Sequence, residues 1–127
     1  MKRFLLLLAF MLTIAISTFA QVGKFKATHI NIRATGYEWV GWKKSDVTIT
    51  WDSDRKHIEI NSGVPQIIDY FRLDVAEEED SVTLYSTATD KNYKPINIYL
   101  TEFKDGTLLF TIEYSDVQYS YQIRKVL

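Results

Sequence analysis

The sequence predicts an all-β domain built from about eight antiparallel strands. Apolar and polar residues alternate with period two in segment after segment beyond residue 21, and no long stretch carries apolar residues at helical spacing. Short polar connections join these segments, which favours antiparallel neighbours in a meander. A meander exposes its two edges unless it closes. We therefore expect a small up-and-down barrel, with a two-sheet sandwich as the alternative that the same pattern permits.

The domain is expected to begin with a strand and an aromatic segment. Residues 24–33 form the strand, with Ile30 and Ile32 on one face. Residues 36–44 alternate less regularly, which is typical of either a strand or a loop that its aromatic side chains pack down. Three aromatic residues lie in that segment: Tyr37, Trp39 and Trp42.

A hairpin and a longer strand are expected next. Alternating apolar residues predict the hairpin over residues 47–60, with a polar turn at residues 52–56. Residues 61–63 interrupt the strand pattern, and residues 66–75 are expected to form one continuous strand after them. The side chains expected on the inner faces of these strands are Val47, Ile49, Trp51, Ile58, Ile60, Ile67, Phe71, Leu73 and Val75.

The second half is expected to contribute four more strands. Residues 77–80 are consecutive acids that turn the chain into a strand over residues 82–88. A strand over residues 95–103 follows and begins with Pro95, where no ladder donor is needed. Gly106 supplies the positive φ of a short hairpin. The last two strands are expected to pair in one register: Tyr114 opposite Val117, Ile112 opposite Tyr119 and Phe110 opposite Tyr121.

The first 20 residues predict export. Lys2 and Arg3 precede a long apolar run, and small residues end the segment at Ala20, as in a secretory signal peptide. We expect cleavage after Ala20 and a single domain over residues 21–127, periplasmic or secreted, without a further membrane span. An uncleaved anchor is the alternative, but the apolar run is short for a span of ~20 residues. The chain has no cysteine, so it is not expected to be a lipoprotein or to carry disulfides.

Charge and composition exclude several partners and chemistries. The chain has 15 basic and 16 acidic residues, and two of the basic ones lie in residues 1–20, which leaves 15 − 2 = 13 basic against 16 acidic. A mildly acidic domain with scattered lysines is not expected to bind nucleic acid. The absence of cysteine excludes thiol nucleophiles and zinc–thiolate sites.

No motif points to catalysis, a cofactor or a metal. His29 and His57 lie on separate expected strands, where an ordinary strand histidine is the better interpretation. The acids at residues 52–54 begin like a calcium loop, but His57 and Gly63 occupy the positions that need glycine and a closing acid. The chain has no glycine-rich phosphate loop and no nucleophile elbow. We therefore predict a noncatalytic protein with no catalytic, cofactor-binding or metal-binding residues.

Two stretches carry a resemblance. They are residues 39–49 together with residues 58–60, and residues 112–123, which combine strand patterns with aromatic anchors. These stretches, and the Ala20/Gln21 junction, resemble small exported β-domain proteins of Bacteroidetes-type bacteria. That group has no assigned activity. The resemblance implies bacterial origin, export and an all-β fold, and it implies no site residue.

Aromatic residues suggest two candidate contact sites. Tyr70, Tyr85 and Tyr99 alternate with apolar residues on three successive expected strands, so a meander would gather them on one outer surface. Tyrosine is enriched at binding surfaces, although exposed sheet faces also favour it for strand stability alone. The second candidate is the aromatic segment with Tyr37, Trp39 and Trp42, which either stacks on a sugar ring or caps one end of the barrel.

The sequence therefore leads to three functional hypotheses. The first is an exported noncatalytic module that contacts an envelope protein or a glycan. The second is a lipocalin-like carrier of a small apolar ligand, which requires an open interior, whereas the expected inner rows are bulky. The third is an enzyme of a kind that the sequence does not reveal.

Overall fold

The computed structural model describes residues 22–62 and 65–126, and these residues form nine β-strands. The expected signal peptide, and the expected domain start at Gln21, lie outside the described residues. The strands are β1 (Val22–Ala34), β2 (Lys43–Asp52), β3 (His57–Asn61), β4 (Gln66–Tyr70), β5 (Asp74–Glu77), β6 (Ser81–Asp90), β7 (Pro95–Phe103), β8 (Leu108–Glu113) and β9 (Val117–Lys125).

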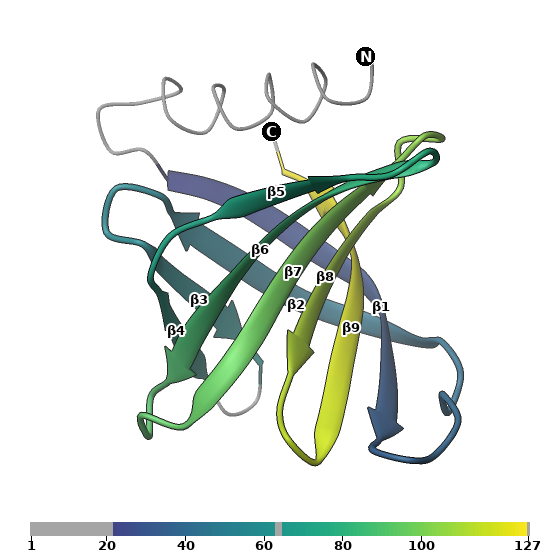
Figure 1. Cartoon of the computed structure of the whole chain (residues 1–127), viewed down its shortest axis with the longest axis horizontal. Coiled ribbons are helices and arrows are strands. Elements are labelled where there is room, and N and C mark those ends of the chain that lie inside the picture. The colour runs from purple at the N-terminus through teal and green to yellow at the C-terminus, as the bar shows by residue number, and fades with distance from the viewer. Residues whose placement is uncertain (1–21, 63–64, 127) are drawn as a thin grey trace.

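The sheet closes on itself. Every pairing is antiparallel, β1 pairs with both β2 and β9, and β4 pairs with β6, so eight strands form a barrel to which β5 adds along β6. Figure 1 shows the strands wrapping around one axis, with the β5–β6 and β7–β8 hairpins side by side at one end. The backbone N–H of Lys104 donates to the carbonyl of Asp80 at 2.9 Å and ties these hairpins together. The prediction of a small up-and-down barrel is confirmed.

The inward side chains form a mostly aliphatic core. The buried ring of Trp51 on β2 makes edge contacts with Tyr70 on β4 and Phe110 on β8, at centroid separations of 5.8 and 5.7 Å. These contacts cross the interior rather than follow the wall. The fully buried side chains are Trp51, Phe25, Phe110, Ile49, Ile58, Ile60, Ile68, Ile98, Leu100 and Ile112.

Most expected strands and registers are confirmed. Ile112 stands opposite Tyr119 and Phe110 opposite Tyr121, as the alternation predicted. Strand β1 needs a bulge at Thr28 between its pairings at Ala27 and His29. Because of the extra residue, Ala27 before the bulge and Ile30 after it both pack into the core.

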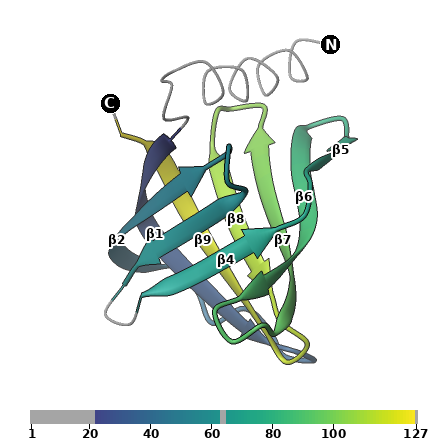
Figure 2. The ribbon, with the colours of Figure 1, turned by 90° about the vertical axis from the view of Figure 1, so that its left-hand side faces the viewer.

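The expected continuous strand over residues 66–75 is wrong in one respect. It is divided into β4 and β5, which pair with different parts of β6 (Figure 2). Three residues separate Tyr70 from Asp74, whereas only two separate their partners Ala88 and Tyr85. This one-residue excess is a bulge, and it reverses which residues face inward.

Two predictions of which side chains face the interior are wrong next to the bulge. On β4 the buried residues are Ile68 and Tyr70, while Ile67 is only partly buried and Phe71 is 71% exposed. Tyr70, expected on the outer surface, is therefore an interior residue. After the bulge Leu73 packs against the core, as predicted, whereas Val75, also expected on the inner face, is 48% exposed on β5, which lies outside the closed barrel.

The aromatic segment is a loop rather than a strand. Residues 35–42 run back along the end of β1, where the N–H of Val40 donates to the carbonyl of Ile32 at 2.9 Å. The Oδ1 of the buried Asn31 accepts from the N–H of Gly41 at 2.8 Å. Gly41 has φ +119°, which favours glycine.

Candidate binding surface

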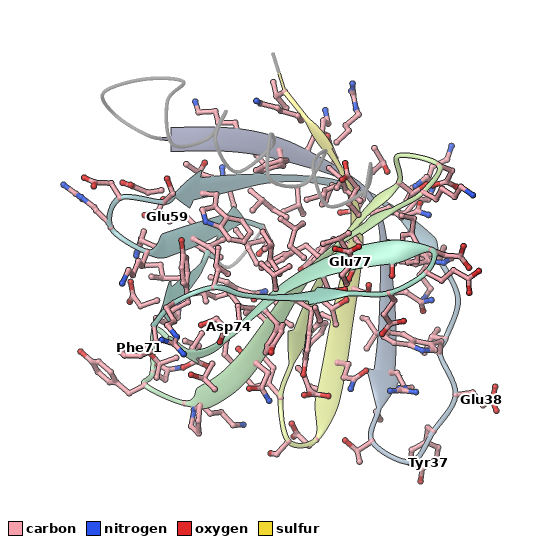
Figure 3. The ribbon with its side chains drawn as sticks, turned by 45° about the horizontal axis from the view of Figure 1, so that its top comes forward. Tyr37, Glu38, Glu59, Phe71, Asp74 and Glu77 are labelled. Carbon is pink, nitrogen blue, oxygen red and sulfur yellow. The ribbon has the colours of Figure 1, made fainter. Side chains whose placement is uncertain are left out.

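A groove lies on the outer wall of the barrel where the bulge meets β6 and β7. It has a volume of about 440 Å³. In Figure 3 the side chains of Phe71 and Asp74 lie on this side of the barrel, and Phe71 projects away from it. We call it the outer groove. Its lining residues are Phe71, Arg72, Asp74, Tyr85, Ser86, Thr87, Asn97 and Tyr99.

Two of the three predicted tyrosines meet in the outer groove. Tyr85 on β6 and Tyr99 on β7 are directly paired across the ladder and point outward. Tyr85 is 39% exposed and its ring remains accessible. Tyr70 does not join them, because it is buried and its hydroxyl accepts a 3.0 Å hydrogen bond from Nε1 of Trp51. Tyr85 and Tyr99 thus lie together on the outer surface as expected, whereas the expected position of Tyr70 beside them is wrong.

Phe71 supplies an aromatic side chain that the sequence did not assign to the site. The bulge turns it outward beside β6, where its N–H donates to the carbonyl of Thr87 at 3.2 Å. The ammonium of Lys56 lies 5.9 Å from the ring centroid, within cation–π range. The adjacent apolar pair Tyr70-Phe71 is the one sequence signal that allows either residue to face outward.

A row of hydrogen-bonded polar side chains extends from the outer groove across β7, β8 and β9. Glu113 is its centre: Oε1 accepts from Asn97 Nδ2 at 3.2 Å and from the Tyr99 hydroxyl at 3.1 Å, and Oε2 accepts from Gln118 Nε2 at 2.6 Å. Burial and the bond to this carboxylate raise the pKa of Tyr99, so its hydroxyl stays protonated. The network fixes the orientation of the Asn97 and Tyr99 side chains, which both line the outer groove.

The same row reaches the second predicted aromatic site. Arg33 Nη2 on β1 donates to Gln118 Oε1 at 2.8 Å, and the guanidinium lies 4.9 Å from the ring centroid of Trp39. Trp39 is therefore linked to the outer wall through Arg33. Tyr37 is 75% exposed and Trp42 is 43% exposed.

A second hollow of about 440 Å³ adjoins the polar row at the end of the barrel. It shares Thr87 and Asn97 with the outer groove, so the two hollows are neighbours, and it also reaches the buried Ala88 and Ile96. Its other lining residues include Pro95, Glu113 and Gln118. Together the hollows give a surface with both polar and apolar groups, and each hollow has aromatic lining: Tyr85 and Tyr99 in the outer groove and Tyr114 in the second hollow.

The outer groove carries balanced charge. Arg72 and Asp74 are its only charged lining residues, and Arg72 Nε lies 3.6 Å from Asp74 Oδ1. The pair is exposed, so it contributes little to stability. Lys56 adds a second positive charge beside Phe71, and Glu113 adds a second negative charge in the adjoining polar row. Basic and acidic groups therefore balance over this stretch of the surface, which offers hydrogen-bonding groups without a net charge that would select an ion.

His57 forms a separate polar cluster on β3 and β4. Its Nδ1 lies 2.7 Å from Asp69 Oδ1, and its Nε2 lies 3.3 Å from Glu59 Oε1. The carboxylates thus bind opposite nitrogens of one ring and do not converge on a common ion. Within residues 22–62 and 65–126, no group of three metal-ligating side chains is placed to hold a metal.

Comparison with known proteins identifies no relative of this chain. No family model, no curated protein and no solved structure matches this chain. Among the described residues, no helix has the length and apolar character needed to cross a membrane.

Proposed function

We propose that this chain is an exported, noncatalytic binding domain of a bacterial cell envelope, and that the outer groove is its binding site. The barrel serves as a rigid support, and the ligand contacts lie on its wall. A site built on strands is held more firmly than one built on loops.

The observation that carries the proposal is the accessible ring of Tyr85 beside a polar side chain that is already oriented. Tyr85 is paired with Tyr99, and the Tyr99 hydroxyl and the Asn97 amide are both held by Glu113. A site that is ordered before binding loses little side-chain freedom when the ligand arrives. Strand stability alone does not require this combination of an exposed ring and a fixed amide.

A lipocalin-like carrier remains a prediction with less support. A carrier needs space within the barrel. Inside this barrel the buried ring of Trp51 contacts the rings of Tyr70 and Phe110, which come from two other strands. The outer groove is the better candidate because its groups are accessible.

A capture experiment tests the proposal. The chain from residue 21 is immobilised and exposed to envelope extract, and both bound protein and bound carbohydrate are analysed. The Tyr85→Ala, Tyr99→Ala double variant is compared with Tyr93→Asn, which removes an exposed tyrosine outside the groove at a positive-φ position that asparagine tolerates. We expect the double variant to lose the bound material and the control to keep it. Equal recovery by all three proteins would refute the proposed function.

A further inference from the structure

We propose that the ligand of the outer groove is a neutral glycan chain, whose sugar rings bind along the wall from Tyr85 toward Gln118. This inference rests on the proposed function and specifies the chemistry of its ligand. It follows from three properties of the surface: its shape, its combination of an aromatic ring with a fixed amide, and its charge.

The shape favours a small elongated ligand over a protein. Each hollow has a volume of about 440 Å³, within the range of small-molecule sites. Stable protein interfaces are instead broad, with ~800 Å² buried on each partner. Because the hollows share Thr87 and Asn97, a linear ligand of several linked units can occupy both.

The chemistry of the lining matches a pyranose ring. A sugar presents an apolar face of C–H groups and an edge of hydroxyls, so it needs an aromatic surface next to groups that both donate and accept. Tyr85 offers the ring, and Asn97 offers the polar groups from the neighbouring strand. One N–H of the Asn97 amide donates to Glu113, and this bond fixes the orientation of the amide. The Oδ1 and the second N–H of Asn97 are then available to bind a pair of sugar hydroxyls.

Charge selects a neutral chain. Arg72 and Asp74 balance each other in the outer groove. Beyond it, Glu113 is satisfied by three hydrogen bonds, and Arg33 lies at the far end of the same row. An acidic polysaccharide requires an excess of basic groups and would meet Asp74 and Glu113 instead.

Calorimetric titration of the chain from residue 21 tests the inference. The probes are hexasaccharides of β-1,4-linked glucose, α-1,4-linked glucose and β-1,4-linked N-acetylglucosamine, the deproteinised neutral glycan fraction of a bacterial envelope, and an acidic hexagalacturonate. We expect at least one neutral probe to bind and the acidic probe not to bind. We expect Tyr85→Ala and Asn97→Ala each to weaken the affinity at least tenfold, with Tyr93→Asn unchanged.

Three results would overturn the glycan inference: no binding of any neutral probe, tighter binding of the acidic probe, or equal affinity of wild type and Tyr85→Ala. Thermal unfolding of each variant verifies that it is folded, and Tyr85→Phe keeps the ring if the alanine variant does not fold. If the capture experiment still yields a protein that depends on Tyr85, the glycan inference fails while the proposed binding function stands. If neither the titration nor the capture experiment shows binding that depends on Tyr85, both the glycan inference and the proposed binding function are refuted.

Discussion

Trp51 Nε1 donates a 3.0 Å hydrogen bond to the hydroxyl of Tyr70 in the interior of the barrel. The two residues come from β2 and β4, and their rings also make an edge contact. Burial raises the pKa of Tyr70, so the hydroxyl remains protonated. This contact fixes the facing of β4, and the bulge that follows it creates one wall of the outer groove.

Tyr70→Phe is expected to destabilise the fold. The substitution leaves the indole N–H of Trp51 buried without its acceptor, which costs about 1–3 kcal/mol. Urea unfolding monitored by fluorescence measures the loss. Trp51→Phe, Tyr70→Phe completes a double-mutant cycle, and a coupling energy near zero would show that the bond contributes nothing.

Glu102→Gln is expected to stabilise the protein at pH 7. Glu102 stands opposite Val82 and Leu108, and within the described part of the chain its buried Oε1 has no hydrogen-bond partner. Burial raises the pKa of this carboxyl, so the folded state holds a proton more tightly than the unfolded state. Stability is therefore lost as the pH rises from the unfolded pKa through the folded pKa.

The expected gain from Glu102→Gln is small because the side chain is only partly buried. We expect ~0.5 kcal/mol at pH 7, or roughly 2–4 °C in Tm. The difference should vanish below pH 4, where Glu102 is protonated in both states. A pH-independent gain, or a loss at pH 7, would refute the account of this carboxyl.

His57 is expected to make stability depend on pH above 6.5, the ordinary pKa of histidine. The hydrogen bond to Asp69 raises the pKa of the His57 imidazole. Burial lowers this pKa, and the hydrogen bond to Glu59 raises it further. The folded pKa lies above the unfolded value, so this contribution is fully present below the unfolded pKa and is lost as the pH rises through the folded pKa. Histidine NMR titration gives the pKa directly. His57→Gln should flatten this part of the stability curve, and an unchanged curve would contradict the assignment.

Asn31→Ala is expected to release the loop at residues 35–42. Asn31 is 7% exposed, and its Oδ1 accepts from the N–H groups of Ile32 and Gly41. We expect a loss of about 1–2 kcal/mol and faster hydrogen exchange at the Gly41 amide. Asn92→Ala is the control, because the exposed Asn92 contributes only a backbone bond to its turn. Unchanged protection of Gly41 would show that another contact holds the loop.

The barrel was predictable because its strands and turns are encoded by residues that are close together in the sequence. Alternation placed Phe110 and Tyr121 on one face, and a tight turn then fixed their register. The bulge between β4 and β5 was not predictable in this way. Apolar residues stand next to each other at Ile67-Ile68 and Tyr70-Phe71, so both facings satisfied the pattern.

The candidate site was only partly predictable for a different reason. Tyr85 and Tyr99 lie on consecutive strands, and a meander alone brings them together. The polar row needs side chains from distant strands: Arg33 and Gln118 are 85 positions apart in the chain. Such pairs depend on the closure of the barrel between β1 and β9, which period-two alternation does not encode.

Ligand is expected to bind on the outer wall of the barrel at Tyr85. Two-dimensional amide NMR, with neutral envelope glycan added to the labelled domain, measures this binding residue by residue. We expect saturable shifts at the amides of Tyr85, Thr87 and Asn97, which line the groove, and their loss in Tyr85→Ala. Shifts confined to the strands around Trp51 and Phe110, or no shifts at all, would contradict it.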